Sequence, residues 1–185
     1  MEYNQLNSSA DLESLIGNLR KEDTRNTTMM NNMQKLMWGV AILYVLLSVM
    51  KFIQNSFWYE KAGAVLILLA FIVFALLFRN YYKAYKSIDY GLPTIEMLSK
   101  AVNRYQLFQW RGLSMLVPLV LEDIGLIMMM YDIFDSPDPL FRILMFQSGF
   151  LFLLAVGSLS GYLIWRKRQK PLRDHALELL KEIRS

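Results

Sequence analysis

Apolar residues in this chain collect into four long blocks separated by charged stretches, instead of recurring singly at helix or strand spacing. The blocks cover residues 36–53, 62–78, 112–131 and 143–165. Each approaches the roughly 20 residues that a helix needs to cross the hydrocarbon layer of a bilayer. None alternates between apolar and polar positions, as the strands of a membrane barrel do. The pattern therefore predicts an all-α integral membrane protein with a four-helix transmembrane bundle.

The basic residues predict how this bundle is oriented. Of the 20 Lys and Arg, the two predicted outer loops and their edges hold only Lys51, Lys61 and Arg142. The others lie in the N-terminal segment, the middle loop and the C-terminal tail. Because cytosolic segments of membrane proteins carry the excess of Lys and Arg, we expect both termini to be cytosolic and the chain to lie in an inner (plasma) membrane.

The N-terminal segment, residues 1–35, is predicted to be a cytosolic amphipathic helix followed by a hinge. Its apolar residues are spaced i, i+3, i+4, i+7, which places them on one face of a helix. They are Leu12, Leu15, Ile16 and Leu19. The polar stretch 20–28 is expected to interrupt the helix before the first span.

The middle loop and the tail each predict a further amphipathic helix on the same side. A turn at 89–93 leads into a loop helix over 94–109, because Pro is favoured at the first position of a helix. Its apolar face holds Ile95, Leu98, Val102, Tyr105 and Phe108. In the basic tail, residues 166–185, Pro171 is expected to open a helix. Its apolar stripe is Leu172, Ala176, Leu179, Leu180 and Ile183.

Two acids, Glu122 and Asp123, lie near the middle of the third block. A charged carboxylate at that depth costs on the order of 3 kcal/mol, and no Lys, Arg or His within the blocks lies level with it. The two acids are therefore expected to be protonated, to face a water-filled cavity, or to accept hydrogen bonds from Tyr44, Ser48 or Ser158. Two interpretations stay open: an ion or proton site, or a protonated pair that holds helices together.

Proline and glycine mark two further features of the blocks. Pro118 removes a backbone hydrogen bond to residue 114, which predicts a kink in the third span. In the fourth block, Gly149, Gly157 and Gly161 predict a face where another helix packs closely, because small residues allow helix backbones to approach. That helix belongs either to this chain or to a second copy in a homodimer.

The sequence argues against an enzyme. There is no Cys, and the only His, His175, lies in the tail away from any Ser or carboxylate constellation. No phosphate-binding loop or metalloprotease motif is present. We therefore expect no catalytic residue, no metal site and no cofactor. The net charge of +4 is too small to indicate nucleic acid as a partner.

Two stretches carry a resemblance in layout: Asp11-Leu-Glu-Ser-Leu-Ile-Gly-Asn-Leu-Arg20, and Asp89-Tyr-Gly-Leu-Pro-Thr-Ile-Glu-Met-Leu98. With the four blocks, they resemble the small four-span proteins of bacterial inner membranes. Some proteins of that kind are similar to membrane-bound regulators that hold a cytosolic partner, such as an alternative sigma factor, at the membrane.

Two functions follow as hypotheses. The first is a non-enzymatic regulatory or scaffold protein whose amphipathic helices engage a cytosolic partner, the bilayer surface or one another. The alternative is a small proton- or cation-coupled transporter or channel that uses Glu122 and Asp123.

Overall fold

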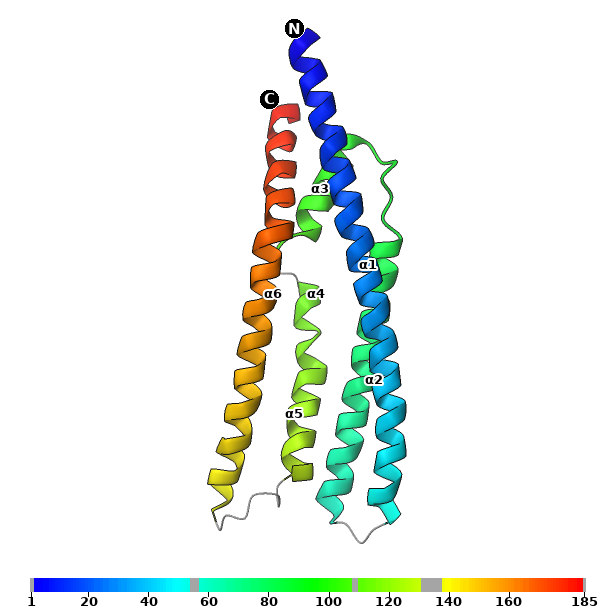
Figure 1. Cartoon of the computed structure of the whole chain (residues 1–185), viewed down its shortest axis with the longest axis vertical. Coiled ribbons are helices and arrows are strands. Elements are labelled where there is room, and N and C mark those ends of the chain that lie inside the picture. Colours follow the sequence, from blue (N-terminus) through cyan, green and yellow to red (C-terminus); the bar gives the residue numbers. More distant parts are fainter. Residues whose placement is uncertain (1, 54–56, 108–109, 131–137, 185) are drawn as a thin grey trace. The chain divides into compact units, whose positions relative to one another are not determined.

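The computed structural model describes residues 2–53, 57–107, 110–130 and 138–184, and every regular element in these ranges is a helix. Figure 1 shows the helices in chain order. They are α1 (Glu2–Ile53), α2 (Trp58–Lys86), α3 (Thr94–Arg104), α4 (Trp110–Leu113), α5 (Leu116–Met130) and α6 (Pro139–Arg184). The predicted all-α class is confirmed.

Three helices in the described ranges, α1, α2 and α6, are long and apolar enough to cross a membrane. They contain the predicted spans 36–53, 62–78 and 143–165. The prediction of a fourth such helix at 112–131 is not met: the chain there divides into α4 and the 15-residue α5. At 1.5 Å per residue α5 is roughly 22 Å long, short of the roughly 30 Å hydrocarbon core. Residue 131 lies outside the described residues.

The predicted hinge at 20–28 is wrong, because α1 continues through it without interruption. No Gly or Pro occurs between Gly17 and Gly39. The threonines of the polar stretch stay helical by bonding the carbonyl four residues back. Thr24 bonds Arg20 at 2.8 Å, and Thr27 bonds Asp23 at 2.7 Å.

The expectation that Pro171 opens a new helix is also wrong, since Pro171 lies inside α6. A proline in a helix cannot bond the carbonyl four residues earlier, here that of Lys167, and costs about 3 kcal/mol. Pro171 is exposed, so water can solvate that carbonyl. The residues that follow are buried, which offsets the cost; they are Ala176, Leu179 and Leu180.

Helix α3 begins as predicted but is shorter than expected. Pro93 stands at its N-cap and Tyr105 at its C-cap. In the preceding turn, the amide of Gly91 donates to the Asp89 carboxylate at 2.8 Å. The helix was predicted to extend to residue 109 but ends at Arg104. Phe108, a member of the expected apolar face, and residue 109 lie outside the described residues.

The chain divides into two compact units, each built from separate stretches of sequence. Unit 1 comprises residues 1–29, 82–109 and 159–185. Unit 2 comprises residues 30–81 and 110–158. Unit 1 therefore combines the three predicted amphipathic segments, and unit 2 holds most of the four apolar blocks.

Inside unit 2, α2 and α5 cross at a pair of glycines. A Cβ placed on Gly63 would lie 2.6 Å from the carbonyl oxygen of Gly125, and one placed on Gly125 would lie 2.8 Å from that of Gly63. No side chain fits at such distances, so this crossing requires glycine at both positions. Helix α1 joins through an edge-to-face contact of Tyr44 and Phe71, whose ring centroids are 5.7 Å apart.

Candidate functional site

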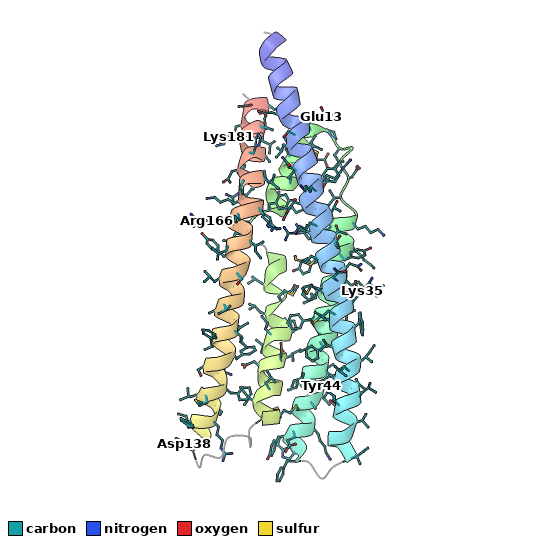
Figure 2. All side chains as sticks on the ribbon, in the orientation of Figure 1. Glu13, Lys35, Tyr44, Asp138, Arg166 and Lys181 are labelled. Atoms are coloured by element: carbon teal, nitrogen blue, oxygen red, sulfur yellow. The ribbon has the colours of Figure 1, made fainter. Side chains whose placement is uncertain are left out.

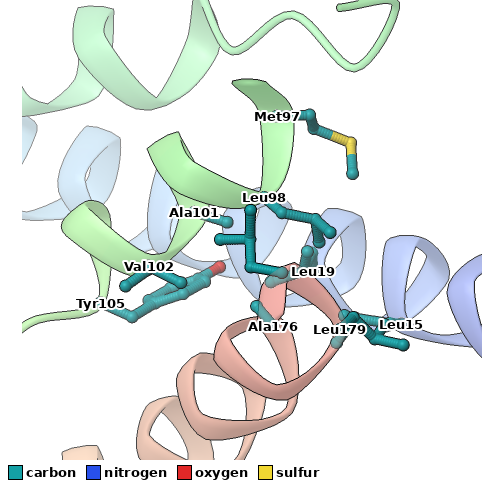
Figure 3. Packing of buried hydrophobic residues seen from close by; sticks show 10 residues of the cluster. Leu15, Leu19, Met97, Leu98, Ala101, Val102, Tyr105, Ala176 and Leu179 are labelled. Atoms are coloured by element: carbon teal, nitrogen blue, oxygen red, sulfur yellow. The ribbon is translucent and has the colours of Figure 1, made fainter. Parts of the chain in front are cut away.

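The apolar stripes of the three amphipathic segments pack against one another inside unit 1. Figure 3 shows side chains of α1, α3 and α6 meeting in one cluster. Its buried members are Leu15, Leu19, Met97, Leu98, Ala101, Val102, Tyr105, Ala176, Leu179 and Leu180. Since these stripes cover one another, unit 1 has a hydrophobic core of its own.

A buried carboxylate lies beside this core. Asp23 of α1 is only 3% exposed. One of its oxygens accepts a hydrogen bond from the Tyr105 hydroxyl at 2.7 Å. The other accepts from the Tyr90 hydroxyl at 2.5 Å and pairs with the Arg104 guanidinium at 3.3 Å. One α1 side chain thus binds the turn before α3, the end of α3 and its C-cap.

The Asp23 network contains more positive than negative charge. Arg104 supplies its counter-ion, and the Arg20 guanidinium lies 5.2 Å from the centroid of the Tyr90 ring. Burial of a carboxylate is tolerated when it is paired and hydrogen-bonded, as here. The same arrangement makes the loss of either ionic partner costly, because the other charge would remain in a poorly solvated site.

The two tyrosines are held in their protonated form. Burial, and next the negative charge of Asp23, raise the pKa of Tyr105 far above its usual value. Burial, and next the hydrogen bond to Asp23, likewise raise the pKa of Tyr90. Both hydroxyls therefore remain donors to Asp23, which argues for a fixed structural network and against proton transfer at neutral pH.

Asn26, one turn after Asp23 on α1, completes the buried polar group. It is 4% exposed, and its side-chain amide nitrogen makes no hydrogen bond within the described ranges. A buried donor without an acceptor costs roughly 1 to 3 kcal/mol.

The α6 side chain Trp165 fastens that helix to the same site. Its indole nitrogen donates to the backbone carbonyl of Tyr105 at 2.9 Å. The guanidinium of Arg173 lies 5.5 Å from the centroid of the Trp165 ring and pairs with Asp174 at 2.7 Å. The C-cap of α3 is therefore held from one side by Asp23 of α1 and from the other by Trp165 of α6.

In unit 2 the two predicted acids have different surroundings. Asp123 accepts from the side-chain amide of Gln147 through both carboxylate oxygens, at 2.9 and 3.0 Å. Glu122 is half-buried and forms no hydrogen bond or ion pair with another described residue. Asp123 and Gln147 thus link α5 to α6, and Gln147 was not among the predicted partners of the acids.

The predicted partners of the acids lie elsewhere. The Tyr44 hydroxyl donates to the sulfur of Met129 at 3.2 Å, which joins α1 to α5. Ser48 is half-buried one turn further along α1, and Ser158 is exposed on α6. The structure does not bring Tyr44, Ser48 or Ser158 into a hydrogen bond with either acid among the described residues.

The predicted packing glycines of α6 contact nothing in the described structure. A Cβ on Gly149, Gly157 or Gly161 would meet no atom of another helix within 4 Å, so none of the described helices packs closely at these three positions. Packing against a second copy stays a prediction. Pro118 is fully buried near the start of α5, and the helix is interrupted at Ser114, whose carbonyl accepts a bond from Val117 instead.

Sequence reasoning missed the Asp23 network because its residues lie in a stretch that was interpreted as a polar hinge. A signal was present: Arg20, Asp23 and Asn26 continue the helical spacing of the apolar stripe that ends at Leu19. A stripe that changes from apolar to polar without leaving its face predicts a buried polar contact. Among the described residues no group of His, Asp or Glu is arranged to hold a metal ion.

Comparison with known proteins gives no match: no protein-family model, no curated protein and no solved structure is similar to this chain.

Proposed function

We propose that the chain is a non-enzymatic multi-pass membrane protein that acts as a regulatory or scaffold protein. In this proposal unit 1 holds a cytosolic partner at an inner (plasma) membrane, and both termini are cytosolic. The observation that carries the proposal is the common core of the three amphipathic segments, locked by Asp23. Separate helices lying on lipid would need neither a shared core nor a buried ion pair.

The common core also changes which surface is available to a partner. The apolar stripes are buried against one another, so a partner meets the polar outer face of unit 1. On α1 this face is exposed and rich in charged and amide side chains, such as Glu13, Asn18 and Lys21.

The three separate segments that make up unit 1 support four crossings of the membrane. The core residues of unit 1 on α1, on α3 and at the end of α6 pack together, so this proposal places them on one side of a membrane. The chain leaves that side along α1 and returns along α2. In this proposal the chain between α3 and the core residues at the end of α6 also crosses an even number of times, so a passage along α6 requires another along α4 and α5. A short, interrupted helix at this position is tolerated where protein covers it, as the buried Pro118 and Gly125 are covered.

The scaffold role is tested by site-specific photocrosslinking in cells. A benzophenone amino acid at Asn18, exposed on unit 1, is expected to yield discrete protein adducts. These adducts should disappear when Leu98→Asp disrupts the core. The matched control is the same probe at Trp58, which is 75% exposed at the start of α2. Identical protein adducts at both positions, or none at Asn18, would contradict the proposal.

A second candidate function is the proton- or cation-coupled transporter or channel, and one observation favours it. Glu122 is half-buried on an apolar helix without a described partner, while the adjacent Asp123 is engaged by Gln147. An unengaged acid within a span is able to bind and release a proton or cation.

Proton flux into proteoliposomes, followed with an internal pH-sensitive dye, tests this candidate. Transport through Glu122 predicts that Glu122→Gln abolishes the flux and that Asp123→Asn, the matched control, retains part of it. Equal flux in Glu122→Gln and in the unmodified protein eliminates Glu122 as the carrier.

A further inference from the structure

Four cations follow directly after the long apolar run of α6. Four of the first five positions after Trp165 are basic, and all four side chains are exposed: Arg166, Lys167, Arg168 and Lys170. From Pro139 to Arg173 this helix contains no Asp or Glu. We call these four residues the basic collar. The first acid that follows in this helix, Asp174, pairs with Arg173.

The collar differs from the neighbouring cation of the same helix. Arg173 is half-buried, stacks over Trp165 and pairs with Asp174, so it serves the packing of unit 1. Trp165 itself is turned toward the C-cap of α3 by its hydrogen bond to Tyr105. Arg166 instead projects outward from α6 (Figure 2). None of the four collar residues takes part in an ion pair with another described residue.

Exposed apolar side chains adjoin the collar on the preceding turn. Leu163 and Ile164 are each 51% exposed. Leu163 precedes Arg166 by three residues and Lys167 by four. Ile164 precedes Lys167 by three residues and Arg168 by four. The two apolar side chains therefore share helix faces with these cations. Tyr162 stacks on Trp165 with centroids 6.0 Å apart, an aromatic pair of the kind found at the level of lipid headgroups.

We propose that the basic collar binds the phosphate of an anionic phospholipid, whose acyl chain lies along Leu163 and Ile164. A ligand that satisfies both surfaces must carry a negative head and an apolar tail, which an acidic peptide does not. Clusters of Lys and Arg directly beside a membrane helix attract the headgroups of anionic lipids. The proposal rests on α6 entering a bilayer, but not on the scaffold role of unit 1.

Binding is tested with the purified full chain in neutral detergent. Native mass spectrometry counts bound phosphatidylglycerol and, in parallel, phosphatidylcholine of the same chain length. The variant is Arg166→Gln with Lys170→Gln, two collar residues one turn apart. The matched control, Lys100→Gln with Lys181→Gln, removes the same charge from exposed positions away from the collar. Circular dichroism confirms that both variants remain helical.

The proposal predicts that the unmodified chain prefers phosphatidylglycerol. The collar variant should bind it at least roughly tenfold more weakly, and the control should bind it unchanged. Equal binding of the two lipids, or equal losses in both variants, would overturn the proposal. So would displacement of the lipid by millimolar inorganic phosphate or by a short polyglutamate peptide, since the collar would then recognise free phosphate or protein. The measurement needs no cytosolic partner, so its failure leaves the scaffold role to its own test.

Discussion

The Tyr105 hydroxyl donates a 2.7 Å hydrogen bond to the carboxylate of Asp23, a residue 82 positions earlier in the chain. Tyr105 is 1% exposed and Asp23 is 3% exposed, so water does not compete for this bond. The contact joins the C-cap of α3 to α1. Tyr105 is also a member of the core to which α1, α3 and α6 contribute, so this bond connects the polar network to that core.

Replacing Asp23 by Asn should destabilise unit 1 strongly. The amide that replaces one carboxylate oxygen faces donors, and Arg104 loses its counter-ion. We expect a loss of roughly 2 to 4 kcal/mol in the free energy of unfolding. Hydrogen exchange of the α3 amides measures it. Asp11→Asn, an exposed acid on the same helix, should change it by less than about 0.5 kcal/mol. Similar losses of unfolding free energy in the two variants would show that Asp23 stabilises unit 1 no more than an exposed acid does.

The tyrosines predict how stability depends on pH. In the folded chain the pKa values of Tyr90 and Tyr105 are raised above the usual 10.0, so the folded state binds more protons than the unfolded state in alkaline solution. Their contribution is complete below pH 10 and is lost as pH rises through the folded values.

The free energy of unfolding of unit 1 should therefore fall steadily above about pH 10. Tyr90→Phe combined with Tyr105→Phe should be less stable at pH 8, because two hydrogen bonds to Asp23 are missing. It should also lose much of the alkaline slope. Chemical denaturation at pH 8, 10 and 11 gives both quantities. An unchanged slope in the double variant would mean that other groups cause the alkaline loss.

The crossing of α2 and α5 predicts which glycines are essential. Gly63→Ala would place a methyl group 2.6 Å from the Gly125 carbonyl, which forces the helices apart and should cost about 1 to 3 kcal/mol. Gly39→Ala is the matched control, because a Cβ there meets nothing within 4 Å. It should be neutral or slightly stabilising, since Ala is the better helix former. Unfolding in increasing mole fractions of dodecyl sulfate compares them. Equal stability of the two variants would contradict this crossing.

Much of the fold was predictable because it follows from local pattern. The spacing of Leu12 to Leu19 and of Leu172 to Leu180 places each set on one helix face, and both faces are buried. The pattern does not specify the partner of such a face, because lipid and another amphipathic helix satisfy an apolar stripe equally well. That the apolar stripes pack against one another is seen only in the fold.

The predictions that the structure contradicts lie where tertiary packing outweighs local preference. Pro171 stays within α6 because the packing of Ala176 and Leu179 in the core stabilises a continuous helix. Asp123 is hydrogen-bonded to Gln147. The predicted partners were chosen by their level along the spans, and that level does not indicate which helices are neighbours. The contact of Gly63 with Gly125 could not be predicted for the same reason, because the sequence does not indicate which helix lies beside α2.

The number of crossings is tested most directly by single-cysteine labelling, for which the cysteine-free chain is well suited. Cysteines at the exposed positions Asn18, Ser87 and Glu178 report on unit 1, and cysteines at Phe57 and Leu140 report on the opposite ends of the spans. A membrane-impermeant maleimide applied to sealed, oriented vesicles should label the first three from one side and the other two from the opposite side. Labelling of Asn18 and Glu178 from opposite sides would mean three crossings, and would contradict a unit 1 assembled from both ends of the chain.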